Sequence, residues 1–207
     1  MSLEERYREV VRRVGGRARL VAVGKGHPAS ALQELYALGQ RDFGENRVDE
    51  MRAKAQALPR DARWHFLGNL QRNKLKEILE VGATVHSFDR PELAGALRDA
   101  PLLVQVHLGG GTHRNGLAPE EVEPALRRMA LAGAPAVGLM LLPPQGEDPR
   151  PHFRRLREMR DALLPRWPFL VELSMGMSED YEAAIEEGAT MVRVGRAIFG
   201  DRAVRPK

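Results

Sequence analysis

Cysteine is absent from the 207 residues of the chain. The chain therefore has no disulfide framework, no thiol nucleophile and no cysteine-ligated metal site. Aromatic residues make up only 5% of the sequence, so a stacking platform for single-stranded nucleic acid is not expected. No apolar run approaches the ~18 residues needed to span a bilayer, and the charged segment 1–14 lacks the apolar stretch of a signal peptide. These absences favour a cytoplasmic protein that has no membrane partner.

Lysine is also scarce. The formal net charge is +4, but only five of the 32 basic residues are lysine, and the arginines alternate with glutamates instead of forming one basic block. Such scattered charge is typical of solvated helix faces, so no specific nucleic-acid partner is expected. One of the rare lysines, Lys25, ends an apolar segment between Gly24 and Gly26. Arginine stays protonated in proteins, whereas a desolvated lysine can lose its proton and act as a nucleophile.

Eight short segments of the sequence are apolar enough to be strands, although the second is short and carries two charges. They cover residues 19–23, 41–45, 64–68, 84–88, 102–108, 136–142, 169–175 and 191–195. Amphipathic segments with helical spacing lie before, between and after them. They cover residues 2–14, 28–39, 47–58, 70–82, 90–100, 118–133, 151–164 and 178–188.

Strands that alternate with helices indicate βαβ units and a parallel sheet. Eight units predict an α/β protein with a (β/α)8 TIM barrel, preceded by an extra N-terminal helix and forming a single domain over residues 1–207. An open doubly wound sheet is the alternative, but it would usually have fewer strands at this length. In a barrel the functional site forms where the carboxyl ends of the strands meet.

The residues that follow each strand are therefore the candidates for the site. In chain order they are Lys25; Glu45 with Asn46; His65 and the segment 68–74; His86 with Ser87; the segments 109–116, 143–148 and 174–178; and Arg193, Gly195 and Arg196. The last two strands are each followed by a glycine and the start of a helix, the first of which we expect Ser178 to cap. Backbone N–H groups at such places bind phosphate well, and TIM barrels often bind phosphate after strands seven and eight. A plain turn is the alternative at each glycine.

Arg193 is unusual because it lies within an apolar strand. The two-residue period of a strand puts Val192 and Val194 on the face toward the helices and Arg193 on the face toward the barrel interior. A buried arginine needs an acceptor. A salt bridge inside the barrel, to Glu45 or Glu172, is therefore an alternative to a ligand-binding role.

A lysine, a phosphate site and an inward arginine at one rim together suggest a Schiff base with a phosphorylated aldehyde. Pyridoxal 5′-phosphate (PLP) is the commonest such aldehyde in proteins. Two alternatives stay open. Lys25 is an ordinary surface lysine at a strand end, or it is the Schiff-base lysine of an aldolase that acts on a sugar phosphate.

Several motifs of the chain resemble those of the pyridoxal phosphate homeostasis protein family, which are small single-domain relatives of the barrel domain of alanine racemase. They are "LVAVGKG", "GQRDFGENRV", "WHFLGNLQRNK", "VHSFDR", "LSMGMSEDYEAAI" and "GATMVRVGRAIFG", in the same order from about residue 18 to residue 200. The resemblance implies a PLP carrier or regulator in vitamin B6 and amino-acid homeostasis, without robust catalysis. It implies PLP itself and PLP-dependent apo-enzymes as partners.

The resemblance also implies roles for individual residues. Lys25 would form the Schiff base with PLP, and Arg193 would face the pyridine nitrogen. Ser178, Gly195 and Arg196 would hold the phosphate, the last two through backbone N–H groups, and Asn46 and His65 would lie near the cofactor. The chain departs from the family at four positions that put phosphate affinity and loop behaviour in question, namely Gly24, Gly26, Arg114 and Arg196.

An arginine at the pyridine nitrogen leaves the ring unprotonated and weakens it as an electron sink. Racemisation would also need a second acid or base opposite the lysine. The three tyrosines, Tyr7, Tyr36 and Tyr181, lie on predicted helices and none ends a strand. We therefore expect a protein that is not an enzyme with robust catalysis. We also expect a monomer, since no exposed apolar stripe stands out in the sequence. A low-activity racemase that uses His65 or a residue of segment 109–116 is the alternative. The spacing of the histidines predicts no metal site.

Overall fold

The structure, a computed structural model, describes residues 1–109 and 115–201. Eight parallel strands form a closed barrel in which each strand pairs with its neighbours in sequence and β8 pairs with β1. The strands are β1 Arg19–Val23, β2 Asp42–Glu45, β3 Arg63–Phe66, β4 Thr84–Phe88, β5 Leu102–Val106, β6 Ala136–Leu141, β7 Glu172–Ser174 and β8 Met191–Val194. The predicted (β/α)8 barrel is confirmed, including its short second strand.

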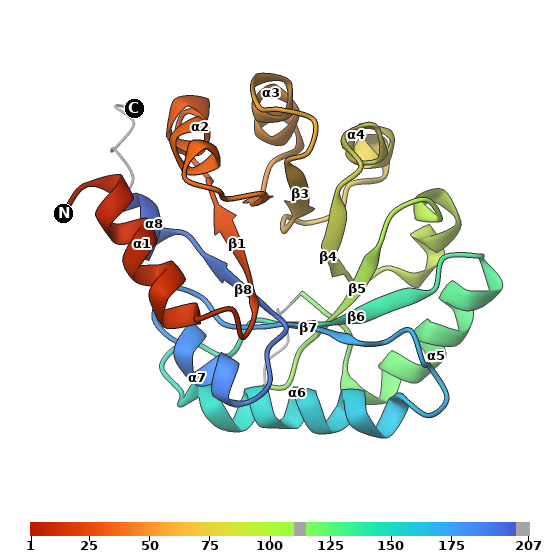
Figure 1. Ribbon diagram of the computed structural model, residues 1–207. Helices are drawn as coiled ribbons and strands as arrows, with labels where there is room; N and C mark the ends of the chain where they lie inside the picture. Colours follow the sequence, from red (N-terminus) through yellow and green to blue (C-terminus); the bar gives the residue numbers. More distant parts are fainter. Residues whose placement is uncertain (110–114, 202–207) are drawn as a thin grey trace.

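Helices surround the barrel and follow the strands in turn (Figure 1). They are α1 Leu3–Val14, α2 Ala29–Ala37, α3 Val48–Ala57, the 3-10 helix η1 Arg72–Lys74 with α4 Leu75–Val81, the 3-10 helix η2 Pro91–Leu97, α5 Pro119–Leu131, α6 Pro149–Leu163, α7 Tyr181–Glu186 and α8 Arg196–Phe199. The extra N-terminal helix is α1. In the described ranges, no helix is both long and apolar enough to cross a membrane.

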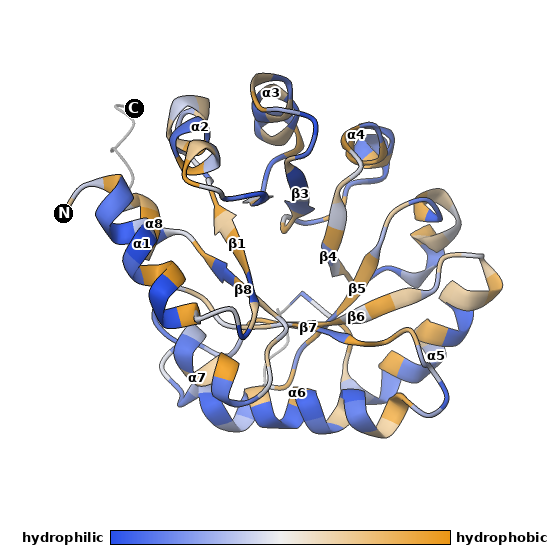
Figure 2. Cartoon of the chain, in the orientation of Figure 1, coloured by the Kyte–Doolittle hydropathy of each residue, from blue (hydrophilic) through white to orange (hydrophobic). Residues whose placement is uncertain are grey.

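The main hydrophobic core lies between the barrel and the helices. Figure 2 shows β5 and β6 as mainly hydrophobic and α6 as mainly hydrophilic, as expected for a buried sheet inside a ring of amphipathic helices. Strand side chains of the opposite parity fill the barrel itself. The apolar ones are buried outside the main core and comprise Val21, Leu103, Met140 and Met191. The rest of the interior is polar, and this polar part carries the site.

The N-terminal helix α1 begins with a capping box, in which the Ser2 hydroxyl accepts from the Glu5 N–H and the Glu5 carboxylate accepts from the Ser2 N–H. It packs beside α8 (Figure 1). The guanidinium of Arg6 donates to the carbonyl oxygens of Ile198 at 2.7 Å and Phe199 at 3.2 Å. Because these carbonyls belong to α8, the extra helix fixes the position of the loop that follows β8.

Two predicted elements differ most from the structure, and α7 also begins later than the predicted helix 178–188. Only residues 172–174 of the segment 169–175 form a strand, because Pro168 lacks an N–H and the chain turns from Trp167 to Leu170. Phe169 and Val171 are consequently exposed. The predicted helix 90–100 is a 3-10 helix over Pro91–Leu97, where Gly95 in its middle and Pro101 soon after it limit helix formation.

Gly68 brings the end of β3 against the end of β2. A Cβ on Gly68 would lie 1.9 Å from the backbone carbonyl oxygen of Asn46, so no other residue fits without a movement of the main chain. We expect Gly68→Ala to lower the free energy of unfolding by about 3 kcal/mol in denaturant titration, because it overpacks a contact between two backbones.

Gly95→Ala is the matched control, since the nearest atom to its added Cβ is 4.0 Å away. The control should change the free energy of unfolding by less than about 1 kcal/mol. Equal stabilities of the two variants would show that the approach of Gly68 to Asn46 is not a tight contact.

Candidate functional site

A cavity of about 540 Å³ opens at the carboxyl ends of the strands. Its lining comes from the ends of β1, β2, β3, β6, β7 and β8, and comprises Val23, Asn46, Leu67, Met140, Leu142, Gln145, Met177, Ser178, Glu179, Asp180, Arg193, Gly195 and Arg196. Five predicted site residues are in this set, namely Asn46, Ser178, Arg193, Gly195 and Arg196. The structure therefore brings together residues that are up to 150 positions apart in the sequence (from 46 to 196).

Lys25 lies in the turn after β1, two residues beyond Val23 of the cavity wall, and is partly exposed; it is not itself among the residues that line the cavity. Among the described residues its ammonium group has no hydrogen bond or ion pair. The backbone on both sides of it is held by α3: the Lys54 ammonium donates to the Gly24 carbonyl at 2.9 Å, and the Gly26 N–H donates to the Glu50 carboxylate at 3.2 Å. Lys25 thus has a fixed main chain and a free side chain.

A buried ion pair lies directly beneath this turn. The Lys54 ammonium is 2.5 Å from one carboxylate oxygen of Glu45, which is fully buried at the end of β2. The second oxygen of Glu45, Oε2, has no hydrogen-bond partner among the described residues. Burial raises the pKa of Glu45, and the hydrogen bond from Lys54 opposes the shift without cancelling it. Glu45 and Lys54 therefore form a buried ion pair that supports the Lys25 turn.

Ser178 connects the loops after β7 and β8. It does not cap α7, which begins at Tyr181 with Asp180 before it, because Asp180 uses its carboxylate to accept from the Met177 N–H at 2.6 Å. The Ser178 hydroxyl instead accepts from the Ala197 N–H at 3.2 Å, which satisfies a free donor in the first turn of α8. Its own proton remains available to a ligand in the cavity.

The side chain and the backbone of Arg196 lie in different places. The side chain is exposed, and its guanidinium pairs with the carboxylate of Glu179 on the rim of the cavity. Its backbone belongs to the first turn of α8, next to Gly195. A contact between Arg196 and a bound anion would therefore come from the main chain, as the family resemblance implies.

Arg193 is buried, with 4% of its surface exposed, and reaches the floor of the cavity from β8. Its guanidinium donates to the Ser174 hydroxyl at 2.5 Å and to the Leu141 carbonyl at 2.9 Å. It forms no salt bridge with Glu45 or Glu172, which pair with Lys54 and Arg19 instead. Burial lowers the pKa of Arg193 to about 10, partly opposed by the charge of Asp180, so the side chain is a cation at neutral pH.

His65 lies deeper than the other predicted site residues. It is not among the residues that line the cavity, and 2% of its surface is exposed. Its Nδ1 is 2.8 Å from Nε2 of His86, and its Nε2 is 3.0 Å from a carboxylate oxygen of Asp42. His86 in turn contacts the Ser174 hydroxyl at 2.7 Å through Nδ1. His65 is therefore connected to the cavity floor only through His86 and Ser174.

The charges at the two ends of this buried group are well defined. Burial would raise the pKa of Asp42, but the hydrogen bonds from His65 and Arg63 outweigh it and lower the pKa to about 2. Burial, together with the nearby charge of Arg193, lowers the pKa of His86 well below its usual value. At neutral pH Asp42 is an anion and His86 is uncharged.

The loop after β5 contributes described residues only at its ends. Arg114 and most of the segment 109–116, a possible source of a second acid or base, lie outside the described residues. Asn115 donates from its side chain to the Asn69 side-chain oxygen at 2.7 Å, which links this loop to the one after β3. Within residues 1–109 and 115–201, no group of three or more histidine or acidic side chains is arranged to bind a metal ion.

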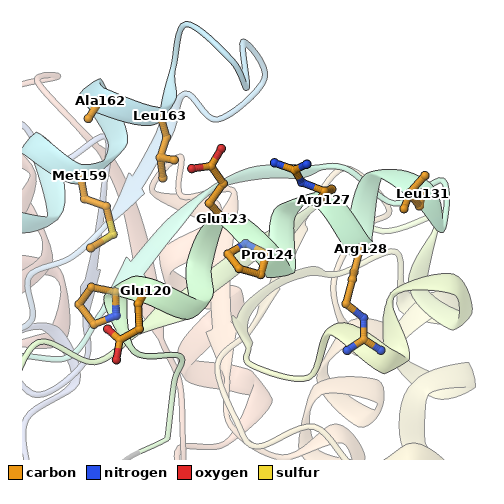
Figure 3. Close-up of a pocket in the computed structure, with 10 residues that line it drawn as sticks. Glu120, Glu123, Pro124, Arg127, Arg128, Leu131, Met159, Ala162 and Leu163 are labelled. Carbon is orange, nitrogen blue, oxygen red and sulfur yellow. The ribbon is translucent and has the colours of Figure 1, made fainter.

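A second hollow, of about 660 Å³, lies on the outer surface between α5 and α6 (Figure 3). Its acidic and basic groups come mainly from α5, and Met159 and Leu163 of α6 form an apolar side. The carboxylate of Glu123 is already held by Arg166 through two hydrogen bonds of 3.0 Å. This hollow is larger than the mouth cavity, but no strand end reaches it. We therefore place the candidate site at the mouth of the barrel.

The cavity wall combines three kinds of group that suit a phosphorylated ligand: a hydroxyl proton, main-chain N–H groups at a helix start, and a buried cation. An unpaired amine, that of Lys25, belongs to the turn beside this wall and is the group that suits an aldehyde. Sequence reasoning found the residues on the wall. It did not assign Lys54 and Asp42, and it named His86 and Ser174 only as residues at strand ends, without a role. The parity of His65 and His86 on adjacent strands was the one available signal for a contact between them.

Comparison with known proteins gives consistent matches over nearly the whole chain. Residues 1–203 match the family described as alanine racemase, N-terminal domain. The chain is 40% identical over 199 residues to the pyridoxal phosphate homeostasis protein of Aquifex aeolicus, covering 89% of this chain and 87% of that one. It is 44% identical over 197 residues to the protein of the same name from Pseudomonas aeruginosa, covering 88% and 84%.

Solved structures agree with these matches. PipY of Synechococcus elongatus, solved without PLP, superposes with a TM-score of 0.89 at 36% identity and covers 96% of this chain and 100% of that one. The same protein with PLP bound superposes with a TM-score of 0.87. Alanine racemase from Corynebacterium glutamicum, at 18% identity, has a TM-score of 0.75 and shares the fold.

Proposed function

Because the chain belongs to the family of pyridoxal phosphate homeostasis proteins, we propose that it binds PLP at the mouth of the barrel. Lys25 holds the cofactor through a Schiff base. The protein acts in PLP and amino-acid homeostasis as a carrier or regulator without robust catalysis. We further propose that it is a cytoplasmic monomer whose partners are PLP and PLP-dependent apo-enzymes.

The observation that carries this proposal is the set of groups around the mouth cavity. Its volume of about 540 Å³ lies within the range of roughly 300–1,000 Å³ for small-molecule sites. Arg193 on the floor and the Ser178 hydroxyl and α8 on one side are suited to a ring nitrogen and a phosphate. The free ammonium of Lys25 is suited to an aldehyde. The residues present therefore fit PLP.

Each residue has a distinct task in this proposal. The amine of Lys25 condenses with the aldehyde carbon and water leaves. The hydroxyl of Ser178 and the backbone N–H groups of Gly195 and Arg196 bind the phosphate oxygens. The guanidinium of Arg193 donates to the pyridine nitrogen, and because it stays protonated it cannot give that nitrogen a full proton.

The described residues also favour carriage over catalysis. When bound, PLP supplies an electron sink for chemistry at an amino-acid α carbon, and racemisation needs a second acid or base opposite the lysine. Tyr7, Tyr36 and Tyr181 all lie on helices outside the barrel, as predicted, and His65 is buried below the cavity floor. PLP held at an open mouth is accessible to solvent and can be exchanged with an amine.

The visible absorbance spectrum of the purified protein mixed with PLP tests this function. We expect a yellow protein whose absorbance changes on treatment with borohydride, because hydride reduces the C=N bond of a Schiff base to a stable secondary amine. Peptide mapping by mass spectrometry should then locate the pyridoxyl group on Lys25. A colourless protein that takes up no PLP would contradict the proposal and favour the aldolase alternative.

Incubation of the loaded protein with single amino-acid enantiomers in deuterated water separates carriage from racemisation. We expect no exchange of the α proton at ordinary enzyme rates. Steady exchange that is lost in Lys25→Ala would mean that the protein is an enzyme.

A further inference from the structure

A line of hydrogen-bonded side chains crosses the inside of the barrel below the cavity. It runs from Asp42 on β2 through His65 on β3 and His86 on β4, then across the interior to Ser174 on β7 and Arg193 on β8. All five residues are buried, with at most 5% of their surface exposed. We call these five residues the interior chain. Of these five residues only Arg193 lines the cavity, and the proposed function gives the other four no role.

With Asp42 ionised and both imidazoles neutral, the interior chain has only one order of donors and acceptors. Asp42 can only accept, so His65 carries its proton on Nε2 and its Nδ1 accepts from the Nε2–H of His86. Nδ1 of His86 is then an acceptor, so the Ser174 hydroxyl donates to it and accepts from Arg193, which can only donate. In the other arrangement His65 is charged and donates to His86, whose Nδ1–H donates to Ser174, because a hydroxyl oxygen can accept two hydrogen bonds.

The charges of Asp42 and His86 are compatible with this order. Asp42 is ionised and can only accept, and Arg63 also donates to both of its oxygens, at 3.0 and 2.6 Å. His86 is neutral, as a ring with one acceptor and one donor nitrogen must be. Every polar atom along the line therefore has a partner of the correct kind, which is the condition under which a buried polar network rigidifies its members.

We propose that Asp42, His65, His86 and Ser174 are positioning residues, which hold the Arg193 guanidinium at the cavity floor through one hydrogen-bond chain of fixed direction. Two neutral imidazoles, each with its proton on Nε2, transmit the order from Asp42 to Arg193. The Leu141 carbonyl holds the other terminal nitrogen of Arg193 at 2.9 Å, so Nη1 and Nη2 are both occupied and the plane of the guanidinium is set. The inference rests on the proposed function only in that Arg193 faces the bound cofactor.

The tautomers can be read by 15N NMR of the imidazoles in the protein without any ligand. We expect His65 and His86 both to be neutral at pH 7 with the proton on Nε2. Assignment uses the single replacements of each histidine by glutamine. A proton on Nδ1 of either ring, or a charged ring, would overturn the proposed direction. This measurement does not depend on whether PLP binds.

Two variants of similar size separate positioning from mere packing at His86. In His86→Gln the side-chain oxygen can accept from Ser174 while the NH2 group donates to His65, so the direction of the chain is kept. His86→Leu fills a similar volume but breaks it. We expect the Kd for PLP to rise more than tenfold in His86→Leu and less than threefold in His86→Gln. Equal losses in the two variants would show a packing role only and overturn the proposal.

The acidic end has its own matched pair. Asp42→Asn removes the anion but keeps an oxygen acceptor, and its NH2 group allows the opposite direction. We expect the single Nε2–H tautomers of His65 and His86 to become mixtures. Asp61→Asn is the control, since Asp61 is also paired with an arginine, Arg41 at 2.9 Å, but lies outside the chain. Unchanged tautomers in Asp42→Asn would mean that Asp42 does not set the order.

Hydrogen exchange of the Arg193 guanidinium protons, measured without ligand, keeps the test independent of the cofactor. We expect exchange to be slow in the wild-type protein, at least tenfold faster in His86→Leu, and close to wild type in His86→Gln. If the wild-type protein fails to bind PLP, the proposed function fails, while the tautomers and the exchange of Arg193 still decide whether these residues hold it. Equally fast exchange in all three proteins would overturn the positioning role.

Discussion

Replacing Lys25 by arginine is expected to abolish the borohydride-trapped pyridoxyl label completely while the protein stays folded. Arginine keeps the positive charge but has no amine that condenses with an aldehyde, so only the covalent step is lost. Folding should be unaffected because the Lys25 side chain is partly exposed and makes no hydrogen bond or ion pair with a described residue. Mass spectrometry of the reduced protein and thermal unfolding measure the two effects separately.

Lys76→Arg is the control for this variant, because the Lys76 side chain is 88% exposed on α4 and does not line the mouth cavity. It should label as the wild type does. With one equivalent of PLP, the wild-type protein should still carry the pyridoxyl label on Lys25, since the groups of the mouth favour this lysine over the other four of the chain. Labelling of Lys25→Arg at another lysine, to the wild-type extent, would mean that the mouth cavity is not the PLP site.

Replacing Lys54 by methionine should have the largest effect on stability. It leaves the buried carboxylate of Glu45 without its cation, and it removes one of the two donors to the Gly24 carbonyl, the other being the His27 N–H at 3.0 Å. Removing one partner of a buried pair costs about 3–5 kcal/mol, so we expect a loss of that size in the free energy of unfolding. Denaturant titration at pH 7 measures it, and Lys76→Met should show no comparable loss.

The double variant Glu45→Leu with Lys54→Met distinguishes the ion pair from the support of the turn. Replacing both charges with apolar groups removes the unpaired carboxylate, so the double variant should be about 2 kcal/mol more stable than Lys54→Met alone. The Gly24 carbonyl keeps the His27 N–H but still lacks the Lys54 ammonium that ties it to α3, so capture of PLP by Lys25 should stay slower than in the wild type. Full recovery of the capture rate would show that α3 does not hold the Lys25 turn.

Much of the fold was predictable because its signals are local. Alternating apolar and amphipathic segments gave the eight strands and the extra N-terminal helix, and the structure confirms the closed barrel. The motifs predicted the family, which the comparisons confirm. The parity of strand β8 correctly turned Arg193 into the barrel and Val192 and Val194 toward the helices. These inferences need only the periods of a strand and a helix.

What was missed depends on contacts between distant segments. Ser178 was expected to cap the helix that follows it, but it accepts from Ala197, because a turn closed by Asp180 delays α7. The segment 169–175 is apolar enough for a strand, yet Pro168 and the turn after it delay the strand to Glu172. The contacts of Glu45 with Lys54 and of His65 with His86 depend on how neighbouring elements are aligned. A local sequence pattern does not predict that alignment. The roles carried over for Lys25, Asn46 and His65 remain predictions.

The interior chain also bears on how the barrel closes. Its side chains, with the Leu141 carbonyl, join β2, β3, β4, β6, β7 and β8, and each link requires that the strands meet in one alignment. If β8 slipped by two residues against β7, its apolar parity would be preserved, but Arg193 would leave Ser174 and become a buried cation without acceptors. Hydrophobic burial alone barely distinguishes such shifted barrels from the native one. The polar interior makes them costly, and so contributes to the fidelity of folding as well as to the site above it.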